Sequence, residues 1–174
     1  KSKVSQEQSR GLSDSLQKQN TIPQLKGFSL LVVDDNLFNQ QLAEEVLKET
    51  QLQISVADDG QKAVDLVASE SFDFILMDIQ MPVMDGYEAT SIIKKRDPNQ
   101  IIIALTANAL KGDRESYTSA GFDDYLSKPL ETNKLYETIQ YWADQRSQGI
   151  IKKEPDKQPQ PSVDHLPKTK IKQP

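Results

Sequence analysis

The chain has 174 residues, a net charge of −5 and no cysteine, which excludes disulfides and thiolate metal sites. No apolar run approaches the roughly 20 residues that span a bilayer, and no signal-peptide core opens the chain, so a soluble, cytoplasmic protein is expected. At this length, one domain with spare residues is expected.

The charge is unevenly distributed. Residues 27–149 carry ten Lys/Arg against twenty-one Asp/Glu, so neither nucleic acid nor a membrane surface is an expected partner for this part of the chain. Residues 1–26 are poor in large apolar side chains and are predicted to be a flexible polar linker. Residues 148–174 are rich in Pro and Lys and are predicted to be a disordered tail. The folded domain is therefore expected at residues 27–147.

The first apolar run, at residues 29–33, predicts a strand that ends in two aspartates. Asn36 then has the position and side chain of a helix N-cap. The helix is expected to reach about Thr50. Its apolar face is expected to consist of Phe38, Leu42, Val46 and Leu47.

Two further pairs of strand and helix follow. Residues 53–57 predict a strand, and Asp59-Gly60 turns the chain into a helix. The inward side of that helix is expected to carry Ala63, Val64, Val67 and Ala68. The run Phe72–Met77 is almost wholly apolar and ends at Asp78, as expected for a strand buried on both faces. A helix is expected at residues 86–96, with Ala89, Ile92 and Ile93 inward.

The last two pairs begin with a strand at residues 101–105 that ends in Thr106. A helix from about Lys111 to Ala120 should stop at Gly121. The segment DYLSKP contains a short fifth strand, and a final helix runs to about Arg146. Its inward positions are marked by Leu135, Ile139 and Trp142. Five alternations of strand and helix predict an α/β fold with a doubly wound parallel sheet, although periodicity does not give the strand order.

Polar residues follow these strands at the carboxyl edge of the sheet: Asp34, Asp35, Asp78, Thr106 and Lys128. Crowded carboxylates repel one another unless a cation lies between them, and hard oxygen ligands suit Mg²⁺. Lysine and a hydroxyl can neutralise and orient a phosphoryl group. Because Asp78 ends the central strand, it is the predicted nucleophile, and its acyl phosphate would be a labile mark suited to signalling.

Four motifs in order, VVDDN, LMDIQMPVMDG, ALTANALKGDRE and AGFDDYLSKP, resemble the receiver domain of two-component response regulators. The resemblance covers residues 28–146, and the sequences of the motifs are most similar to those of receivers in hybrid sensor histidine kinases. It implies a flavodoxin-like fold with a five-stranded parallel sheet, strand order 2-1-3-4-5 and helices on both faces.

The same resemblance implies that Asp78 accepts a phosphoryl group from a phosphohistidine. Asp35, Asp78 and the main-chain carbonyl of Gln80 would bind Mg²⁺, with Mn²⁺ as a substitute, while Asp34 acts largely through water. Thr106 and Lys128 would contact the phosphoryl group.

Further positions take roles from the resemblance alone. Tyr125 matches the aromatic residue that changes its exposure as Thr106 moves. Gln80 and Asn108 match positions that tune the lifetime of the phosphoryl group, and since neither can activate water by acid or base chemistry, modest self-hydrolysis is expected. Lys128-Pro129 matches the usual cis peptide of the family.

The implied partners are the phosphohistidine-bearing dimerisation domain of a histidine kinase and a histidine phosphotransfer domain. Two alternatives stay open at this point: a stand-alone response regulator, and a receiver-like binding module that works without phosphorylation. An aspartyl-phosphate phosphatase of the haloacid dehalogenase type would need a second Asp two residues after its nucleophile, where Asn36 follows Asp34. A flavin module would need a phosphate loop after the first strand, and none is present. Whether the chain counts as an enzyme is left open.

Overall fold

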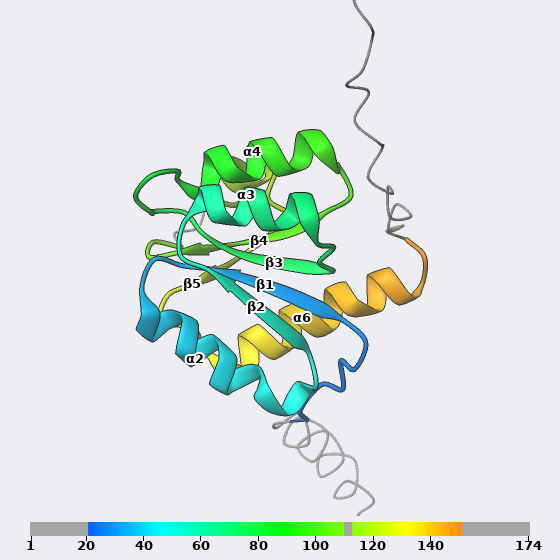
Figure 1. The fold of residues 1–174 in the computed structure, drawn as a ribbon. Coiled ribbons are helices and arrows are strands. Elements are labelled where there is room, and N and C mark those ends of the chain that lie inside the picture. The colour runs from blue at the N-terminus through cyan, green and yellow to red at the C-terminus, as the bar shows by residue number, and fades with distance from the viewer. Residues whose placement is uncertain (1–20, 110–112, 151–174) are drawn as a thin grey trace, which may run out of the picture.

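A computed structural model describes residues 21–109 and 113–150, which form a five-stranded parallel sheet between two layers of helices (Figure 1). The strands are β1 (Ser29–Val33), β2 (Gln53–Ala57), β3 (Phe74–Asp78), β4 (Ile101–Thr106) and β5 (Asp124–Ser127). The helices are α2 (Leu37–Leu47), η1 (Lys48–Thr50), α3 (Gly60–Ser69), α4 (Gly86–Arg96), α5 (Asp113–Ser119) and α6 (Thr132–Ser147). The order β2-β1-β3-β4-β5 confirms the fold class and the implied topology.

Alternate residues of the central strands pack on opposite faces of the sheet. In β3, Ile75 and Met77 face one core, while Phe74 and Leu76 face the other. The first core is closed by α3, α4 and α5 and the second by α2 and α6, and Figure 1 shows α3 and α4 on one side of the sheet and α2 and α6 on the other. Burial on both faces explains why these strands read as nearly continuous apolar runs.

Helix α2 begins as predicted, because the Asn36 side chain accepts a hydrogen bond from the main-chain N–H of Phe38 at 2.9 Å. The prediction that Phe38 faces inward is wrong, since its side chain is 70% exposed. The first turn of α2 follows directly from the loop after β1, so it extends past the strand ends, where there is no sheet surface to cover. Ala43 and Leu47, further along the helix, are fully buried.

In α3, Ala63 and Val64 are buried as predicted, but Ala68 is exposed. At 3.6 residues per turn, Ala68 lies about 140° around the helix from Ala63, which places it beyond the edge of the buried face. Leu66, which lies on the other side of that face, packs partly against the core instead.

Two glycines allow close or unusual backbone geometry at the ends of helices. Gly121 ends α5 with a φ of +101°, and its N–H donates to the carbonyl of Thr118 at 3.0 Å while Phe122 N–H donates to the carbonyl of Tyr117 at 3.0 Å. This is the paired C-terminal capping pattern predicted to stop the helix. At Gly86, a Cβ atom would overlap the main-chain oxygen of Asp78, so only glycine lets α4 begin against the loop after β3.

The segments expected to be linker and tail lie mostly outside the described residues, as does the predicted start of a helix at Lys111. Leu25, which precedes the expected domain start, is 1% exposed and packs in the second core. The peptide Lys128-Pro129 is cis, as the resemblance implied. Within residues 21–109 and 113–150, none of the helices has the length and apolar character needed to cross a membrane.

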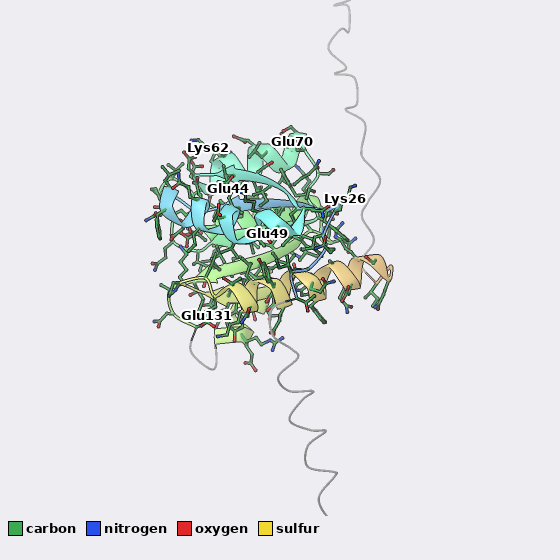
Figure 2. All side chains as sticks on the ribbon, turned by 90° about the horizontal axis from the view of Figure 1, so that it is seen from below. Lys26, Glu44, Glu49, Lys62, Glu70 and Glu131 are labelled. Atoms are coloured by element: carbon green, nitrogen blue, oxygen red, sulfur yellow. The ribbon has the colours of Figure 1, made fainter. Side chains whose placement is uncertain are left out.

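Charged side chains lie on the outside of this assembly of helices and sheet. Figure 2 labels six exposed examples, namely Lys26, Glu44, Glu49, Lys62, Glu70 and Glu131. Against this background, Asp34, Asp73 and Asp78 are exceptional because they are buried, and two of them, Asp34 and Asp78, lie at the carboxyl edge of the sheet.

Candidate functional site

The residues that end the strands meet at the carboxyl edge of the sheet. Asp34 and Asp35 follow β1, Asp78 ends β3, and Lys128 follows β5. One carboxylate oxygen from each of the three aspartates lies within 4.8 Å of the others. The topology therefore brings together four residues that the sequence separates by up to about ninety positions.

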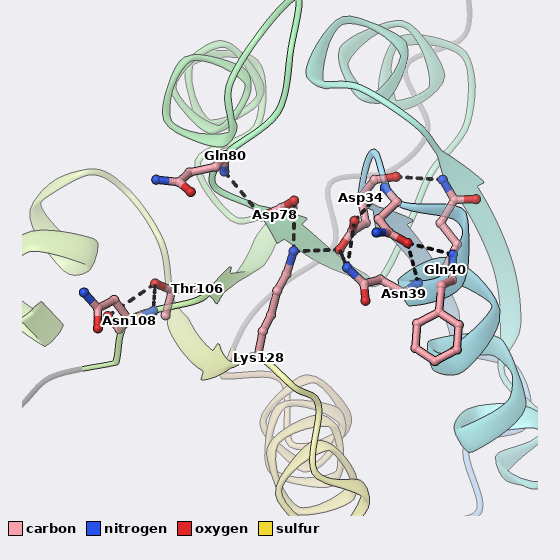
Figure 3. A network of polar contacts seen from close by, with 10 residues as sticks. Asp34, Asn39, Gln40, Asp78, Gln80, Thr106, Asn108 and Lys128 are labelled. Atoms are coloured by element: carbon pink, nitrogen blue, oxygen red, sulfur yellow. Dashed lines mark hydrogen bonds and ion pairs between the residues drawn. The ribbon is translucent and has the colours of Figure 1, made fainter.

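Lys128 lies between two of the carboxylates (Figure 3). Its Nζ atom is 2.9 Å from Asp34 Oδ2 and 2.9 Å from Asp78 Oδ2. Asp34 is fully buried and Asp78 is 5% exposed, whereas Asp35 is open to solvent. One lysine thus faces three carboxylates, and the cluster keeps an excess of negative charge.

Burial and the neighbouring charges together shift the pKa of Asp78 and of Lys128. Burial raises the pKa of Asp78, and the hydrogen bond and charge of Lys128 offset that effect only in part, while the charge of Asp34 adds to it. For Lys128, burial lowers the pKa, but hydrogen bonds to Asp34 and Asp78 outweigh it and leave the pKa raised. Lys128 has two carboxylate partners, whereas Asp78 shares its lysine with Asp34, so an additional cation would stabilise the ionised cluster.

Asp34 is held by donors from the start of α2. Its Oδ1 atom accepts the main-chain N–H of Asn36 at 2.9 Å, and the Asn39 side-chain amide lies 3.2 Å from each of its carboxylate oxygens. The Gln40 amide donates to the main-chain oxygen of Asp34 at 2.7 Å. Sequence reasoning missed Asn39 and Gln40. Their position in the first turn after a strand-end aspartate was a usable signal, because helical side chains lean toward the helix N-terminus.

The predicted lifetime and phosphoryl-contact residues line the same edge. The main-chain N–H of Gln80 donates to Asp78 Oδ1 at 3.3 Å, and the Gln80 side chain is exposed. Thr106 is 6% exposed, and its Oγ1 atom donates to the Asn108 carbonyl at 3.3 Å and accepts the Asn108 N–H at 3.1 Å. Asp78, Gln80, Thr106, Asn108 and Lys128 all line one cleft of about 580 Å³.

A third missed residue is Tyr117 of α5, which lines the cleft and is 6% exposed. Its hydroxyl donates to Thr106 Oγ1 at 3.0 Å. The predicted switch residue Tyr125 is partly buried, and its ring centroid lies 5.4 Å from that of Tyr117. No local sequence pattern predicts a role for Tyr117 at the site, because an aromatic residue within an amphipathic helix is ordinarily a core residue.

Comparison with known proteins places this geometry in a family. Residues 30–140 match the family model of the response regulator receiver domain. The chain belongs to this family. The receiver domain is similar to hybrid signal transduction histidine kinase I of Dictyostelium discoideum, with 39% identity over 136 residues, which are 70% of this chain and 8% of the kinase. The chain therefore spans a small part of that relative.

Solved structures are also similar to the receiver domain, and two of them bear on the site. The receiver domain of a Pseudomonas aeruginosa sensor histidine kinase, with a magnesium ion coordinated in its active-site cleft, is 41% identical at a TM-score of 0.62, over 68% of this chain and 98% of that one. The receiver domain of a Saccharomyces cerevisiae response regulator, crystallised with a histidine phosphotransfer signalling protein, is 28% identical at a TM-score of 0.65, over 73% of this chain and 94% of the matched chain.

Proposed function

We propose that this receiver domain accepts a phosphoryl group from a phosphohistidine onto Asp78 and passes the signal on within a phosphorelay. The observation that carries the proposal is the pairing of Lys128 with two buried carboxylates, at 2.9 Å each, on the edge of a cleft that Thr106 also lines. A buried aspartate with a raised pKa that shares its lysine lowers the stability of the fold, so stability does not explain its presence. It is typical of a site that binds or transfers a charged group.

The donor set fits Mg²⁺. Asp34, Asp35 and Asp78 offer hard carboxylate oxygens within 4.8 Å of one another, and the cluster holds more negative than positive charge. Asp35, Asp78 and the main-chain carbonyl of Gln80 would hold the ion, with Asp34 acting through water. Bound there, Mg²⁺ or its substitute Mn²⁺ supplies electrostatic stabilisation of the transferring oxygens. The magnesium in the cleft of the Pseudomonas relative supports this assignment.

In the transfer itself, a carboxylate oxygen of Asp78 attacks phosphorus. The new P–O bond forms as the P–N bond to the donor imidazole breaks, and the electron pair of that bond returns to the imidazole nitrogen. Lys128 stabilises the charge on the phosphoryl oxygens, and the Thr106 hydroxyl donates to one of them. Movement of Thr106 toward the phosphoryl group would change the exposure of Tyr125, which signals the phosphorylated state.

The lifetime of the aspartyl phosphate is proposed to be long, with slow self-dephosphorylation. Gln80 and Asn108 lie at the cleft, and their amides neither take up nor release protons at neutral pH. An acyl phosphate with a half-life of seconds would contradict this part of the proposal.

The proposed context is a hybrid histidine kinase, with the phosphohistidine domain of the kinase as donor and a histidine phosphotransfer domain as acceptor. The similarity to a hybrid kinase and to a receiver crystallised with a phosphotransfer protein supports it. The cytoplasmic location stays a prediction.

Intact mass after incubation with acetyl phosphate, with and without Mg²⁺, tests the proposal. The chain should gain one phosphoryl group, about 80 Da, only when Mg²⁺ is present, and Asp78→Asn should gain none. The matched control is Asp58→Asn, because Asp58 follows β2 at the same sheet edge but is exposed and paired with Lys62. A mass gain that survives Asp78→Asn, or its absence in the unmodified chain, would refute the assignment.

A further inference from the structure

Tyr117 reaches the site from α5, a helix that contributes none of the charged residues of the cluster. The side chain is buried, and its hydroxyl lies 3.0 Å from Thr106 Oγ1 and 3.3 Å from the Asn108 carbonyl oxygen. A buried tyrosine hydroxyl needs a partner, and here the partners are the last residue of β4, Thr106, and a residue of the loop that follows it, Asn108.

The hydrogen bonds of Thr106 show what this contact does. The Thr106 hydroxyl carries one proton, which it donates to the Asn108 carbonyl, while its oxygen accepts from Asn108 N–H and from Tyr117. Figure 3 shows the hydroxyl on the side of Asn108, turned away from Asp78. To donate to a phosphoryl oxygen on Asp78, the Thr106 hydroxyl has to give up its bond to the Asn108 carbonyl and turn toward Asp78. We expect the bond from the Tyr117 hydroxyl to break in the same movement.

The ring of Tyr117 makes the second connection. It packs against Tyr125 with ring centroids 5.4 Å apart and planes inclined at 35°, and against Phe122 edge to face at 6.3 Å. One side chain therefore contacts Thr106 through its hydroxyl and Tyr125 through its ring.

We propose that Tyr117 is a positioning residue that stabilises the unphosphorylated arrangement of Thr106 and links its release to Tyr125. This inference rests on the proposed function, phosphorylation of Asp78. In this proposal the Tyr117 hydroxyl bond is lost when Thr106 Oγ1 moves toward Asp78, so the tyrosine opposes the phosphorylated state and adds to the phosphoryl binding energy needed to reach it.

Beryllofluoride, a mimic of the phosphoryl group, tests the inference without a donor protein. Its affinity in the presence of Mg²⁺ can be measured by calorimetry or fluorine NMR on the full chain. Tyr117→Phe keeps the ring contacts and removes the hydroxyl, so it should bind beryllofluoride about two- to tenfold more tightly, the effect of one net hydrogen bond. In a Thr106→Ala background, Tyr117→Phe should cause no further change.

Tyr136→Phe is the matched control. Its hydroxyl also donates to a main-chain carbonyl, that of Val46, at 2.7 Å, but on the opposite face of the sheet, so its loss should leave the affinity unchanged. No binding to the unmodified chain would overturn the proposed function and this inference together. Binding to the unmodified chain that Tyr117→Phe leaves equal or weakens would overturn this inference alone. An equal gain in beryllofluoride affinity from Tyr117→Phe with and without the Thr106 hydroxyl would also overturn this inference, because it would show that the substitution acts through packing.

Discussion

The two ends of β3 carry the same residue type in opposite electrostatic situations. Asp73, just before the strand, accepts the Ser29 N–H at 2.8 Å and pairs with Arg146 at 3.0 Å, so one carboxylate faces one guanidinium. Asp78, at the other end, shares Lys128 with Asp34 and lies close to Asp35. Both are at least nine-tenths buried. Burial alone therefore does not identify a functional acid, whereas the balance of charge around it does.

The largest effect is expected from breaking the ion pair between Asp73 and Arg146, at the charge-balanced end of β3. Asp73→Ala leaves the Arg146 guanidinium buried without its carboxylate, and breaking a buried pair in this way should lower the free energy of unfolding by about 3 kcal/mol. Urea denaturation measures it. Asp58→Ala, which removes an exposed ion pair with Lys62, is the control and should change stability little. Equal losses in both variants would contradict the distinction.

The next largest effect is expected at the other end of β3, where Asp78 lies in a cluster of three carboxylates and one lysine. If the carboxylates at Asp78 hold a cation, Mg²⁺ at a hundred times its dissociation constant should stabilise the folded domain by about 2.7 kcal/mol. Thermal unfolding at matched ionic strength measures the gain. Asp35→Asn should abolish most of it, whereas a variant at the balanced end, Asp73→Asn, should keep it. A stabilisation that Asp35→Asn leaves intact would place the ion elsewhere.

A smaller effect follows from the raised pKa of Asp78. In metal-free protein, Asp78→Asn removes a carboxylate whose ionised form burial disfavours, so it should raise the melting temperature by a few degrees at neutral pH. The pKa is higher in the folded than in the unfolded state, so the unmodified chain gains stability relative to the variant as the pH falls through the folded pKa. The difference between the two should shrink toward acid pH. A difference that grows there would show the opposite shift.

The smallest effect lies in the loop after Asp78. Val83 has a φ of +70° and is 84% exposed, a conformation that costs a β-branched residue free energy. Val83→Gly should therefore stabilise the domain by about 0.5 to 1 kcal/mol. The same change at Val56, in the extended backbone of β2, should destabilise it. Loss of stability at both positions would show that Val83 carries no strain.

Local patterns in the sequence determined most of the fold. An apolar run placed β1 at its observed residues, because a strand buried on both faces needs a nearly unbroken row of apolar side chains. The edge strand β2, which is only partly buried, also lies at its predicted residues. Asn36 and Gly121 marked a helix start and a helix end, since capping depends on residues a few positions apart. The alternation of strands and helices then required the strand-end aspartates and Lys128 to share one edge.

The tertiary structure alone decided which side chains touch. Arg146 meets Asp73 across 73 positions of the chain, and Tyr117 meets Thr106 through the packing of α5 on the sheet. Phe38 fits the apolar pattern of its helix and is still exposed, because the sheet ends before it. Periodicity specifies the face of an element on which a residue lies. The distance to a partner depends on how the elements pack, and that packing also set the charge balance that distinguishes Asp78 from Asp73.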